Sequence, residues 1–355
     1  MPSIAPARLH QIGSAIFTAS GSSARETEII VTHLVEANLK GHDSHGIGML
    51  PRYIDDKHKG LFTTNGKLRT VTDTGAVVVV ESDQASGQVM AHEATELLIA
   101  RAKKHGVALV ALRNTHHMGR IGTYGEMCAS AGLSSLHFVN VTGHHPIVAP
   151  FGGADGRFAT NPICITVPAS ENRPALILDF ATSKVALGKV RVAFNKGEAL
   201  PEGLVIGADG KPTNDPGAMY REPIGALTPM GEHKGSGLAL IAELFAGAYC
   251  GGGTMQPGNA RDRSVVNNML SIAFDPTLLG DANWIKREVD AMVAYAKASP
   301  KLGKDDVMVA GEPELRMKDK RNREGIPVDD TTWEQILKAG ESVGLGRGQL
   351  QSMAR

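Results

Sequence analysis

Short apolar runs alternate with longer helical patterns between residues 75 and 314, and this alternation limits the chain to one fold class. The run "AVVVVES" predicts a buried strand, because β-branched residues suit a pleated sheet. The segment "GQVMAHEATELLIARAKKHG" predicts a helix, and "VALVALRN" predicts a second strand directly after it. Further strands are predicted in "LSSLHFVNV", "RFATNPICITVP", "PALILDF" and "SVVNNMLSIAF", and a long helix in "HKGSGLALIAELFAGAYCGG". The pattern predicts an α/β fold in which helices surround a central sheet.

The two ends of the chain carry helical rather than alternating patterns. The segment "SSARETEIIVTHLVEANLKG" predicts a helix that Ser22 or Ser23 caps and that a glycine ends. The tail segment "TTWEQILKAGESVG" predicts another helix. We therefore expect a helical domain of residues 1–74, completed by residues 315–355, and an α/β domain of residues 75–314.

Composition argues against several classes of partner. Lysine plus arginine equals aspartate plus glutamate at 37 each, so net charge gives no attraction to nucleic acid or a membrane surface. The cysteines (Cys128, Cys164 and Cys250) are far apart and form no CxxC, which argues against disulfides and structural zinc. No apolar stretch is long enough to span a membrane, and the start lacks a signal-peptide pattern. We expect a reduced, cytoplasmic protein without nucleic-acid or membrane partners.

The 13 histidines form no metal-binding pattern. The pairs His116/His117 and His144/His145 are adjacent, so their side chains would diverge on a strand. Neither HExxH nor HxH occurs, and no histidine–carboxylate triad has helical spacing. We therefore expect no metal site.

The segment "GHDSHGIGMLPRY" concentrates ionisable groups where a predicted helix ends. The His45 imidazole can give or take a proton near neutral pH, and the Ser44 hydroxyl can orient it. The Arg52 guanidinium can form paired hydrogen bonds to a carboxylate. The alternative is a polar loop between helices with exposed histidines. A serine hydrolase is disfavoured, because adjacent residues rarely aim at each other as a nucleophile and its base must, and the G-x-S-x-G elbow is absent.

A glycine-rich turn, "RNTHHMGRIGTYGE", lies between a predicted strand and a predicted helix. Gly119, Gly122 and Gly125 recur at every third position, and backbone N–H groups at a helix start are free to hold an anion. The spacing is GxxGxxG, however, and neither the GxGxxG of dinucleotide-binding folds nor a P-loop occurs elsewhere. The turn therefore indicates an anion site more clearly than a nucleotide site.

Three other segments place polar groups at the ends of predicted elements. Lys234 precedes a helix that starts with Gly235 and Gly237, which suits an anion site or simply close helix packing. The strand end "LDFATS" suits ribose hydroxyls, although on its own a turn or helix cap is favoured. Thr160 stands in "ATNPICITVP", where the proline forces an extended turn, and alone it indicates little.

Taken in order, these segments resemble the type-2 malate/L-lactate dehydrogenase family of NAD(P)-dependent 2-oxo acid oxidoreductases. The resemblance rests on "GHDSHGIGMLPRY", "NTHHMGRIGTYGE", "TNPICITVP", "LDFATS", "EHKGSGLAL" and "GEPELRMKDKRNREGIP", which span residues 41–327. The first two motifs are most similar to those of the hydroxycarboxylate dehydrogenase B members. The resemblance implies a non-Rossmann mixed β-sheet flanked by helices, NAD or NADP as cofactor, and an active site completed across a homodimer.

The resemblance also implies roles for single residues. Ser44, His45 and His117 match the catalytic group, and Thr160 matches a substrate contact. Met49 stands where many members have an arginine, so Arg52 is our candidate for the substrate carboxylate. The implied cofactor contacts are His45, Gly119, Arg120, Ile121, Asp179, Phe180, Ala181, Thr182, Ser183, Lys234, Asn267, Gly311, Glu312, Pro313 and Glu314.

The implied reaction interconverts a 2-oxo acid and a 2-hydroxycarboxylate by hydride transfer, with a histidine as proton donor. Lys189 stands where some members complete the Ser–His pair with an aspartate, so we do not expect a three-residue relay. An alternative within the family is reduction of a cyclic imine acid such as Δ1-piperideine-2-carboxylate. The sequence leaves open the substrate, the choice of NAD or NADP, and which of His45 and His117 transfers the proton.

Overall fold

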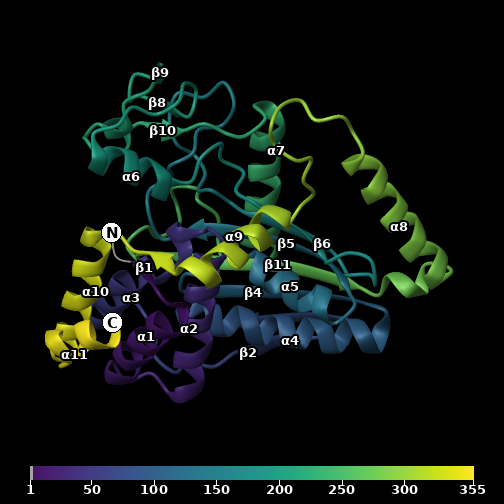
Figure 1. Cartoon of the computed structure of the whole chain (residues 1–355), viewed down its shortest axis with the longest axis horizontal. Helices are drawn as coiled ribbons and strands as arrows, with labels where there is room; N and C mark the ends of the chain where they lie inside the picture. Colours follow the sequence, from purple (N-terminus) through teal and green to yellow (C-terminus); the bar gives the residue numbers. More distant parts are fainter. Residues whose placement is uncertain (1–2) are drawn as a thin grey trace.

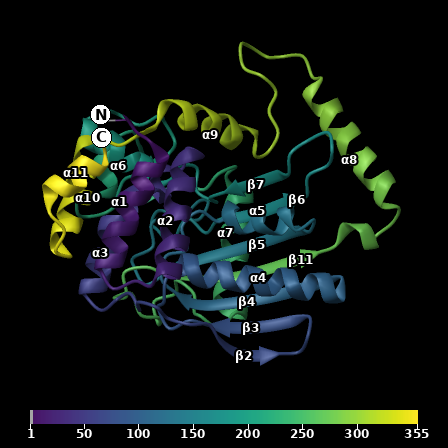
Figure 2. The same cartoon turned by 60° about the horizontal axis from the view of Figure 1, so that its bottom comes forward.

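A seven-stranded sheet forms the centre of the protein, in a computed structural model that describes residues 3–355 (Figure 1). The strands lie in the order β2, β3, β4, β11, β5, β6, β7 (Figure 2). Their bounds are β2 (Arg69–Asp73), β3 (Val77–Glu81), β4 (Val107–Thr115), β5 (Ser134–Thr142), β6 (Ile163–Val167), β7 (Leu176–Phe180) and β11 (Val266–Phe274). Among these described strands only β3 and β4 pair in parallel. The predicted non-Rossmann mixed sheet is therefore confirmed, because a Rossmann sheet is mostly parallel.

The central strand, β11, brings distant segments together. It pairs with β4 on one side and with β5 on the other, and Asn267 lies opposite both Thr115 and Val141. Most of its residues are buried, as expected for a strand covered on both faces. The ends of β4 and β5 therefore meet the start of β11. This row of strand ends is called the sheet edge below.

Helices cover both faces of the sheet. On one face, α4 (Gly87–His105) packs on β4 and β11, and α5 (Gly122–Ser130) packs on β5 and β6. On the other face, α7 (His233–Ala242) continues into the π-helix η4 (Glu243–Tyr249), which packs on β5 and β11. The sequence predicts one regular helix here; the change of helix type begins at the buried Glu243, whose carboxylate accepts hydrogen bonds from Asn140 and Asn161.

The two ends of the chain pack together, as the helical patterns predict. Strand β1 (Ser3–Ile4) pairs with β12 (Ile326–Pro327), while α10 and α11 lie against the N-terminal helices (Figure 1). The helix bounds are α1 (Pro6–Ala19), α2 (Ala24–Leu39), α3 (Leu50–His58), α9 (Glu312–Glu324), α10 (Asp330–Ser342) and α11 (Arg347–Met353). The Ser23 hydroxyl caps α2, because it accepts the Glu26 N–H at 3.2 Å.

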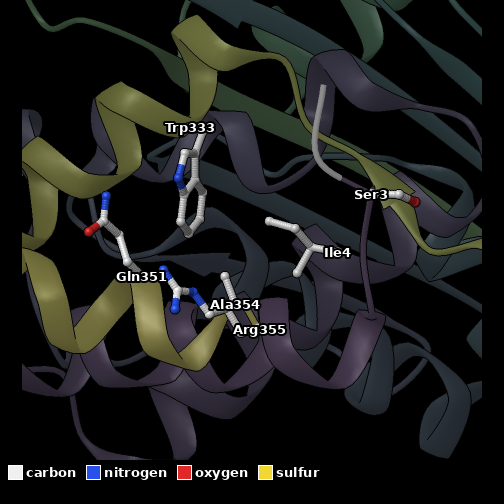
Figure 3. A pocket seen from close by; sticks show the side chains of 6 residues that line it. All are labelled: Ser3, Ile4, Trp333, Gln351, Ala354 and Arg355. Atoms are coloured by element: carbon white, nitrogen blue, oxygen red, sulfur yellow. The ribbon is translucent and has the colours of Figure 1, made fainter.

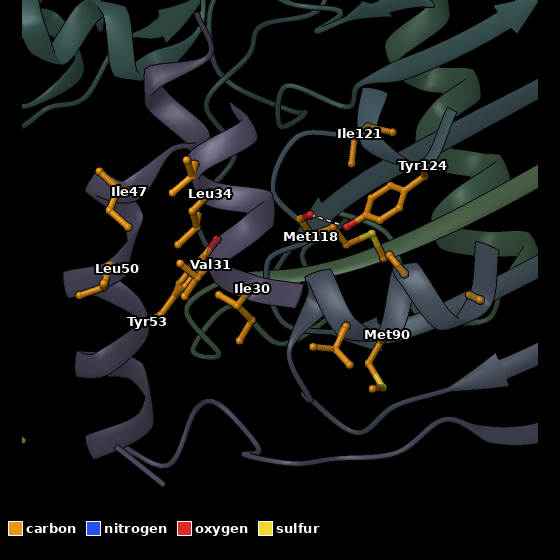
Figure 4. Close-up of a cluster of buried hydrophobic side chains, with 14 of the residues drawn as sticks. Ile30, Val31, Leu34, Ile47, Leu50, Tyr53, Met90, Met118, Ile121 and Tyr124 are labelled. Carbon is orange, nitrogen blue, oxygen red and sulfur yellow. Dashed lines mark hydrogen bonds between the residues drawn. The ribbon is translucent and has the colours of Figure 1, made fainter. Parts of the chain in front are cut away.

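One hydrophobic cluster joins these end helices to the sheet domain. Figure 4 shows Ile30 and Leu34 of α2 close to Leu50 and Tyr53 of α3, with Met90 of α4 beyond them. All five side chains are almost fully buried. Because this core is continuous, α3 and α4 hold the residues they carry at fixed positions over the sheet edge.

A small unit beside the main sheet has no counterpart in the sequence prediction. Its three strands are β8 (Val205–Ile206), β9 (Pro212–Thr213) and β10 (Ala226–Leu227), with α6 (Leu187–Lys196) and the 3₁₀ turn η3 (Pro216–Met219) beside them. Strands of two residues are too short to give a periodic pattern, which explains why the sequence does not predict them. The unit has its own hydrophobic cluster around Val148, Val190 and Val205.

The helix α8 (Ala282–Lys297) lies at the periphery of the molecule (Figures 1 and 2), where Asp290 is bound by Ser170, Asn172 and Arg173 of the turn between β6 and β7. None of its described residues is buried. Within residues 3–355, no helix combines the length and the apolar character needed to cross a membrane.

Candidate active site

Polar side chains gather where β4, β5 and β7 end and where β6 and β11 begin. A strand that ends in a turn leaves backbone groups unpaired, so buried polar side chains at this edge are needed to bind them. The almost fully buried polar residues of this edge are Thr115, His116, Asn140, Thr142, Asn161, Thr182, Ser183, Asn267 and Asn268. Loops and helices from four separate parts of the chain converge here, which makes it the candidate active site.

Ser44, His45 and His117 meet at this edge, as predicted. Ser44 and His45 belong to the 3₁₀ turn η1 (Asp43–His45), and His117 follows β4. The Ser44 hydroxyl lies 2.9 Å from His45 Nδ1, and the rings of His45 and His117 stack with centroids 5.5 Å apart. Contrary to the expectation for adjacent residues, the side chains of Ser44 and His45 in this 3₁₀ turn do point at each other.

The first turn of α6 supports Ser44 from behind. A Cβ on Gly188 would lie 2.6 Å from the Ser44 Cβ, so only glycine lets the two segments approach this closely. The neighbouring Lys189 is exposed. The Ser–His pair thus rests against backbone rather than against a carboxylate.

Burial holds both stacked histidines in the neutral form. The pKa of His45 is lowered to about 4, chiefly by burial and then by the nearby His42 and Arg120. The pKa of His117 lies well below its ordinary value, chiefly through burial and then through the charges of His45 and His116. At neutral pH the ligand-free site therefore presents two uncharged imidazoles.

Tyr53 and Gln88, which the sequence does not indicate, stand behind His117. The Tyr53 hydroxyl lies 2.6 Å from His117 Nδ1 and accepts a hydrogen bond from Gln88 Nε2 at 2.7 Å. Burial raises the pKa of Tyr53 above its ordinary value, so the hydroxyl keeps its proton. Tyr53 ends the motif "GHDSHGIGMLPRY" but occupies an apolar helix position, and Gln88 lies in another helix, so neither gave a catalytic signal.

Arg52 lies next to Tyr53 on α3, and neighbouring side chains already bind part of its guanidinium. Its Nη2 donates to the Ser264 hydroxyl at 3.0 Å, and its Nε lies 3.6 Å from the Asp56 carboxylate. Asp56 also accepts hydrogen bonds from Ser264 and from His116 Nε2 at 2.9 Å. Burial raises the pKa of Asp56, but these donors lower it more, so its net shift is downward. Arg52 is thus oriented by Asp56 and Ser264 while 45% of its side chain stays exposed.

The predicted glycine-rich turn is held on several sides. The Met118 N–H donates to Asn267 Oδ1 at 2.9 Å, and the Met118 carbonyl accepts the Tyr124 hydroxyl at 2.6 Å (Figure 4). The Arg120 N–H donates to His33 Nε2 at 2.8 Å. Gly119 has φ +73°, and a Cβ there would lie 2.3 Å from His33 Nε2, so the turn requires glycine.

Two backbone donors of this turn are buried and unused. The N–H groups of Gly119 and Ile121 have no hydrogen-bond partner within residues 3–355. Both residues are buried. Unpaired donors at the start of α5 are suited to hold an anion, and the anion site that the sequence predicts for this turn stays a prediction.

Arg120 and Asp179 lie against each other beside the turn. The Arg120 side chain is buried, with Nη1 2.8 Å from Glu126 and Nε 3.6 Å from Asp179. Asp179 Oδ2 accepts the Gly122 N–H at 2.8 Å and so caps α5. Arg120 is therefore already paired and does not present a free cation in this structure.

The predicted segment Gly311 to Glu314 lies between the start of β7 and the loop that carries Ser44. Gly311 lies against β7, because a Cβ on it would be 3.3 Å from the Ile177 nitrogen. Glu312 and Pro313 begin α9, and Glu314 Oε1 is 3.5 Å from His42 Nε2. His42 belongs to the loop that carries Ser44, so this segment closes the site on its outer side.

The remaining predicted residues hold the strand ends. Thr182 donates its hydroxyl to the Thr160 carbonyl at 3.0 Å, and Ser183 donates to the Val185 carbonyl. Phe180 and Ala181 lie between these residues and Asp179 at the end of β7. The hydroxyls of this segment therefore bind backbone carbonyls, as side chains in a turn or cap do.

Lys234 is exposed at the start of α7, as an anion-binding lysine would be. Its ammonium group makes no ion pair with the residues that the structure describes. Gly235 is needed for close approach, since a Cβ would lie 1.9 Å from the Met230 carbonyl, whereas nothing lies within 4 Å of one on Gly237. The close-packing interpretation therefore holds for Gly235 alone.

Two hollows lie outside the candidate active site. One of about 290 Å³ lies between the chain ends and is lined by Ser3, Ile4, Trp333, Gln351, Ala354 and Arg355 (Figure 3). The other, of about 710 Å³, lies between the small three-stranded unit and η4. Neither is lined by Ser44, His45 or His117. Among the described residues, no three histidine, cysteine or acidic side chains are grouped as metal ligands would be.

Comparisons with known proteins agree with one another. The family model described as malate/L-lactate dehydrogenase matches residues 4–337. Hydroxycarboxylate dehydrogenase B of Escherichia coli (strain K12) is 42% identical over 98% of this chain and 96% of its own. L-lactate dehydrogenase of Cupriavidus necator is 38% identical over 94% of this chain and 96% of its own. A solved Escherichia coli structure, titled as a malate/lactate dehydrogenase, superposes with a TM-score of 0.95 at 40% identity, covering 99% of this chain and 98% of the other.

Proposed function

The chain belongs to the malate/L-lactate dehydrogenase family and is an oxidoreductase, and we propose that it interconverts a 2-oxo acid and the matching 2-hydroxycarboxylate with NAD or NADP. One observation carries the proposal: the stacked pair of His45 and His117, with Arg52 on α3 next to Tyr53, whose hydroxyl contacts His117. A 2-oxo acid offers a carbonyl oxygen for an imidazole and a carboxylate for a guanidinium, so the three groups match the substrate's polar ends.

The residues at the sheet edge fit a nicotinamide dinucleotide. The buried, unpaired N–H groups of Gly119 and Ile121 are suitable donors for its pyrophosphate. The turn Gly311 to Glu314, the strand end Asp179 to Ser183, and the exposed Lys234 surround the same edge, and Asn267 fixes the turn through Met118. Asp179 and Arg120 act on the cofactor through the backbone they hold, because their charges pair with each other.

In the mechanism, bound reduced nicotinamide supplies hydride to the carbonyl carbon of the acid. Arg52 binds the carboxylate, since Asp56 and Ser264 hold its guanidinium in place while part of it stays exposed. One of His45 and His117 gives a proton to the oxygen, and in the oxidative direction it removes that proton. Thr160 completes the substrate side of the site from the turn before β6.

The neutral state of both histidines favours oxidation in the free protein. With the pKa of His45 at about 4, its imidazole is ready to accept a proton at neutral pH. Reduction requires that a proton be taken up first. A substrate carboxylate bound at Arg52 would raise the histidine pKa, so that the imidazole takes up this proton from water.

We also propose that two copies of the chain associate as a homodimer. The helix α8 exposes a row of large apolar side chains, with Trp284 56%, Met292 59% and Tyr295 77% exposed. An amphipathic helix that buries none of its own residues is typical of an interface. Light scattering after gel filtration should give twice the mass of 37.5 kDa, and W284E should reduce it to the monomer.

Steady-state assays with a substrate panel test the proposed activity. Pyruvate, oxaloacetate, glyoxylate and longer 2-oxo acids are each offered with NADH and with NADPH, alongside Δ1-piperideine-2-carboxylate. We expect turnover of at least one 2-oxo acid that H45Q and H117Q both abolish. Exclusive turnover of the cyclic imine would contradict the proposed substrate class.

A further inference from the structure

Gln88 has no role in the reaction outlined above, yet it is placed as if it had one. It lies in the first turn of α4 and is fully buried. The Ser86 hydroxyl donates to its Oε1 at 3.3 Å, and its Nε2 faces the Tyr53 hydroxyl. A buried amide with both ends bonded is a fixed donor rather than a filler of space.

The direction of the next two hydrogen bonds follows from that orientation. Gln88 Nε2 donates to the Tyr53 hydroxyl, so the hydroxyl oxygen is the acceptor in that bond. Tyr53 has one proton left to give, and His117 Nδ1, at 2.6 Å, is the acceptor beside it in the described structure. If His117 instead donated from Nδ1, the buried Tyr53 proton would have no acceptor among residues 3–355.

We propose that Gln88 is a positioning residue that acts through Tyr53 to keep His117 neutral, with its one ring proton on Nε2. Ser86, Gln88 and Tyr53 then donate in a single direction, and His117 Nε2–H is the last donor in the row. Hydrogen bonds aligned in this way polarise one another, so the final donor is strengthened. The assignment rests on the proposed function only in taking the substrate oxygen as the acceptor of that last bond.

This arrangement divides the work between the two histidines. His117 holds the substrate oxygen by a hydrogen bond but does not exchange its proton. If its Nδ1 carried a proton, the Tyr53 hydroxyl beside it would have no other acceptor for its own proton. His45 has Ser44 as partner, and a serine hydroxyl can both donate and accept. The Nδ1 of His45 is therefore satisfied whether its ring is neutral or protonated, and His45 is the group that transfers the proton.

Two substitutions of Gln88 test the proposal without a ligand. In Q88E, measured at pH 8.5, the introduced carboxylate can only accept, so Tyr53 donates to it and His117 must donate from Nδ1. The ¹⁵N spectrum of protein labelled at histidine reports the change, with the His117 signals identified by their absence in H117Q. Wild type should show protonated Nε2, and Q88E should show protonated Nδ1. Q88M, which removes the donor without adding charge, should give a mixture of the two.

The Y53F background separates positioning from general damage. Gln88 acts through Tyr53, so Q88E should change the His117 signals by less than a tenth as much once the tyrosine hydroxyl is absent. Protonated Nε2 in both folded Gln88 variants would overturn the proposal, as would an equally large change in the Y53F background. If Q88E fails to fold, Q88M alone decides.

Kinetics on the holoenzyme separate this inference from the proposed function. Q88M should lower kcat for 2-oxo acid reduction about tenfold and change the KM for NADH less than twofold. A tautomer change in a protein that reduces no 2-oxo acid would contradict the proposed function and leave the His117 assignment standing. Unchanged tautomers in an active dehydrogenase would contradict the His117 assignment and leave the proposed function standing.

Discussion

The Tyr53 hydroxyl lies 2.6 Å from His117 Nδ1, so a residue on α3 fixes the ring state of a residue that follows β4. The contact joins the helical end of the chain to the sheet. It depends on the shared hydrophobic core, in which the Tyr53 ring is fully buried. The active site is therefore assembled between the two parts of the chain rather than within either of them.

Y53F should lower kcat for 2-oxo acid reduction by about 10- to 100-fold, because one buried hydrogen bond to His117 is lost in the transition state. The ring still fills the core, so the melting temperature should change by less than a few degrees. Y249F, at an exposed position of η4, is the matched control and should leave kcat unchanged. Equal kcat values for Y53F and wild type would show that the hydroxyl has no part in turnover.

The pH dependence of kcat/KM should differ between the two directions. Since burial holds the pKa of His45 at about 4, the free enzyme must gain a proton before reduction. The value for reduction should thus fall about tenfold per unit as pH rises from 5 to 8. The value for oxidation should stay level over that range, because the base is already unprotonated. Opposite slopes, measured by stopped assays at constant ionic strength, would count against His45 as the proton-transfer group.

Arg52 should affect substrate affinity and not cofactor affinity. R52K keeps the charge but loses the forked geometry that binds a carboxylate with two hydrogen bonds, so KM for the 2-oxo acid should rise about tenfold or more. R52Q should raise it further. The Kd for NADH, measured by its fluorescence, serves as the internal control and should change less than twofold. A KM that stays constant in R52Q would remove Arg52 from the substrate site.

Gly119 should be required for cofactor binding. In G119A the new Cβ would lie 2.3 Å from His33 Nε2 on a backbone with φ +73°, so the turn must shift. We expect the Kd for NADH or NADPH to rise at least tenfold. G132A is the matched control, because Gly132 has φ +81° but nothing within 4 Å of its Cβ position. If both variants weaken binding equally, backbone strain alone accounts for the effect.

The sequence predicted the main strands and long helices because their apolar patterns run for many residues. It also predicted that Ser44, His45 and His117 act together, since all three stand in motifs that resemble a known family. It could not predict the roles of Tyr53 and Gln88, because their side chains occupy core-facing helix positions that look structural.

The other missed residues have a similar cause. His33 and Asp56 act on turns that lie more than 50 residues away in the chain, and no local pattern encodes such a contact. Arg120 is expected from the sequence to contact the cofactor, and its pairing with Glu126 and Asp179 depends on how α5 meets β7. The sequence thus predicts which groups carry the chemistry, whereas the groups that hold them in place are found only in the structure.

Transfer of a labelled hydride tests the central claim most directly. The protein is incubated with NADH or NADPH carrying deuterium at C4 of the nicotinamide, together with the 2-oxo acids of the panel, and the products are examined by mass spectrometry and NMR. The account predicts one deuterium at C2 of a 2-hydroxycarboxylate, formed by wild type and lost in H45Q. Absence of deuterium at C2 of every product, from protein that binds the cofactor, would contradict it.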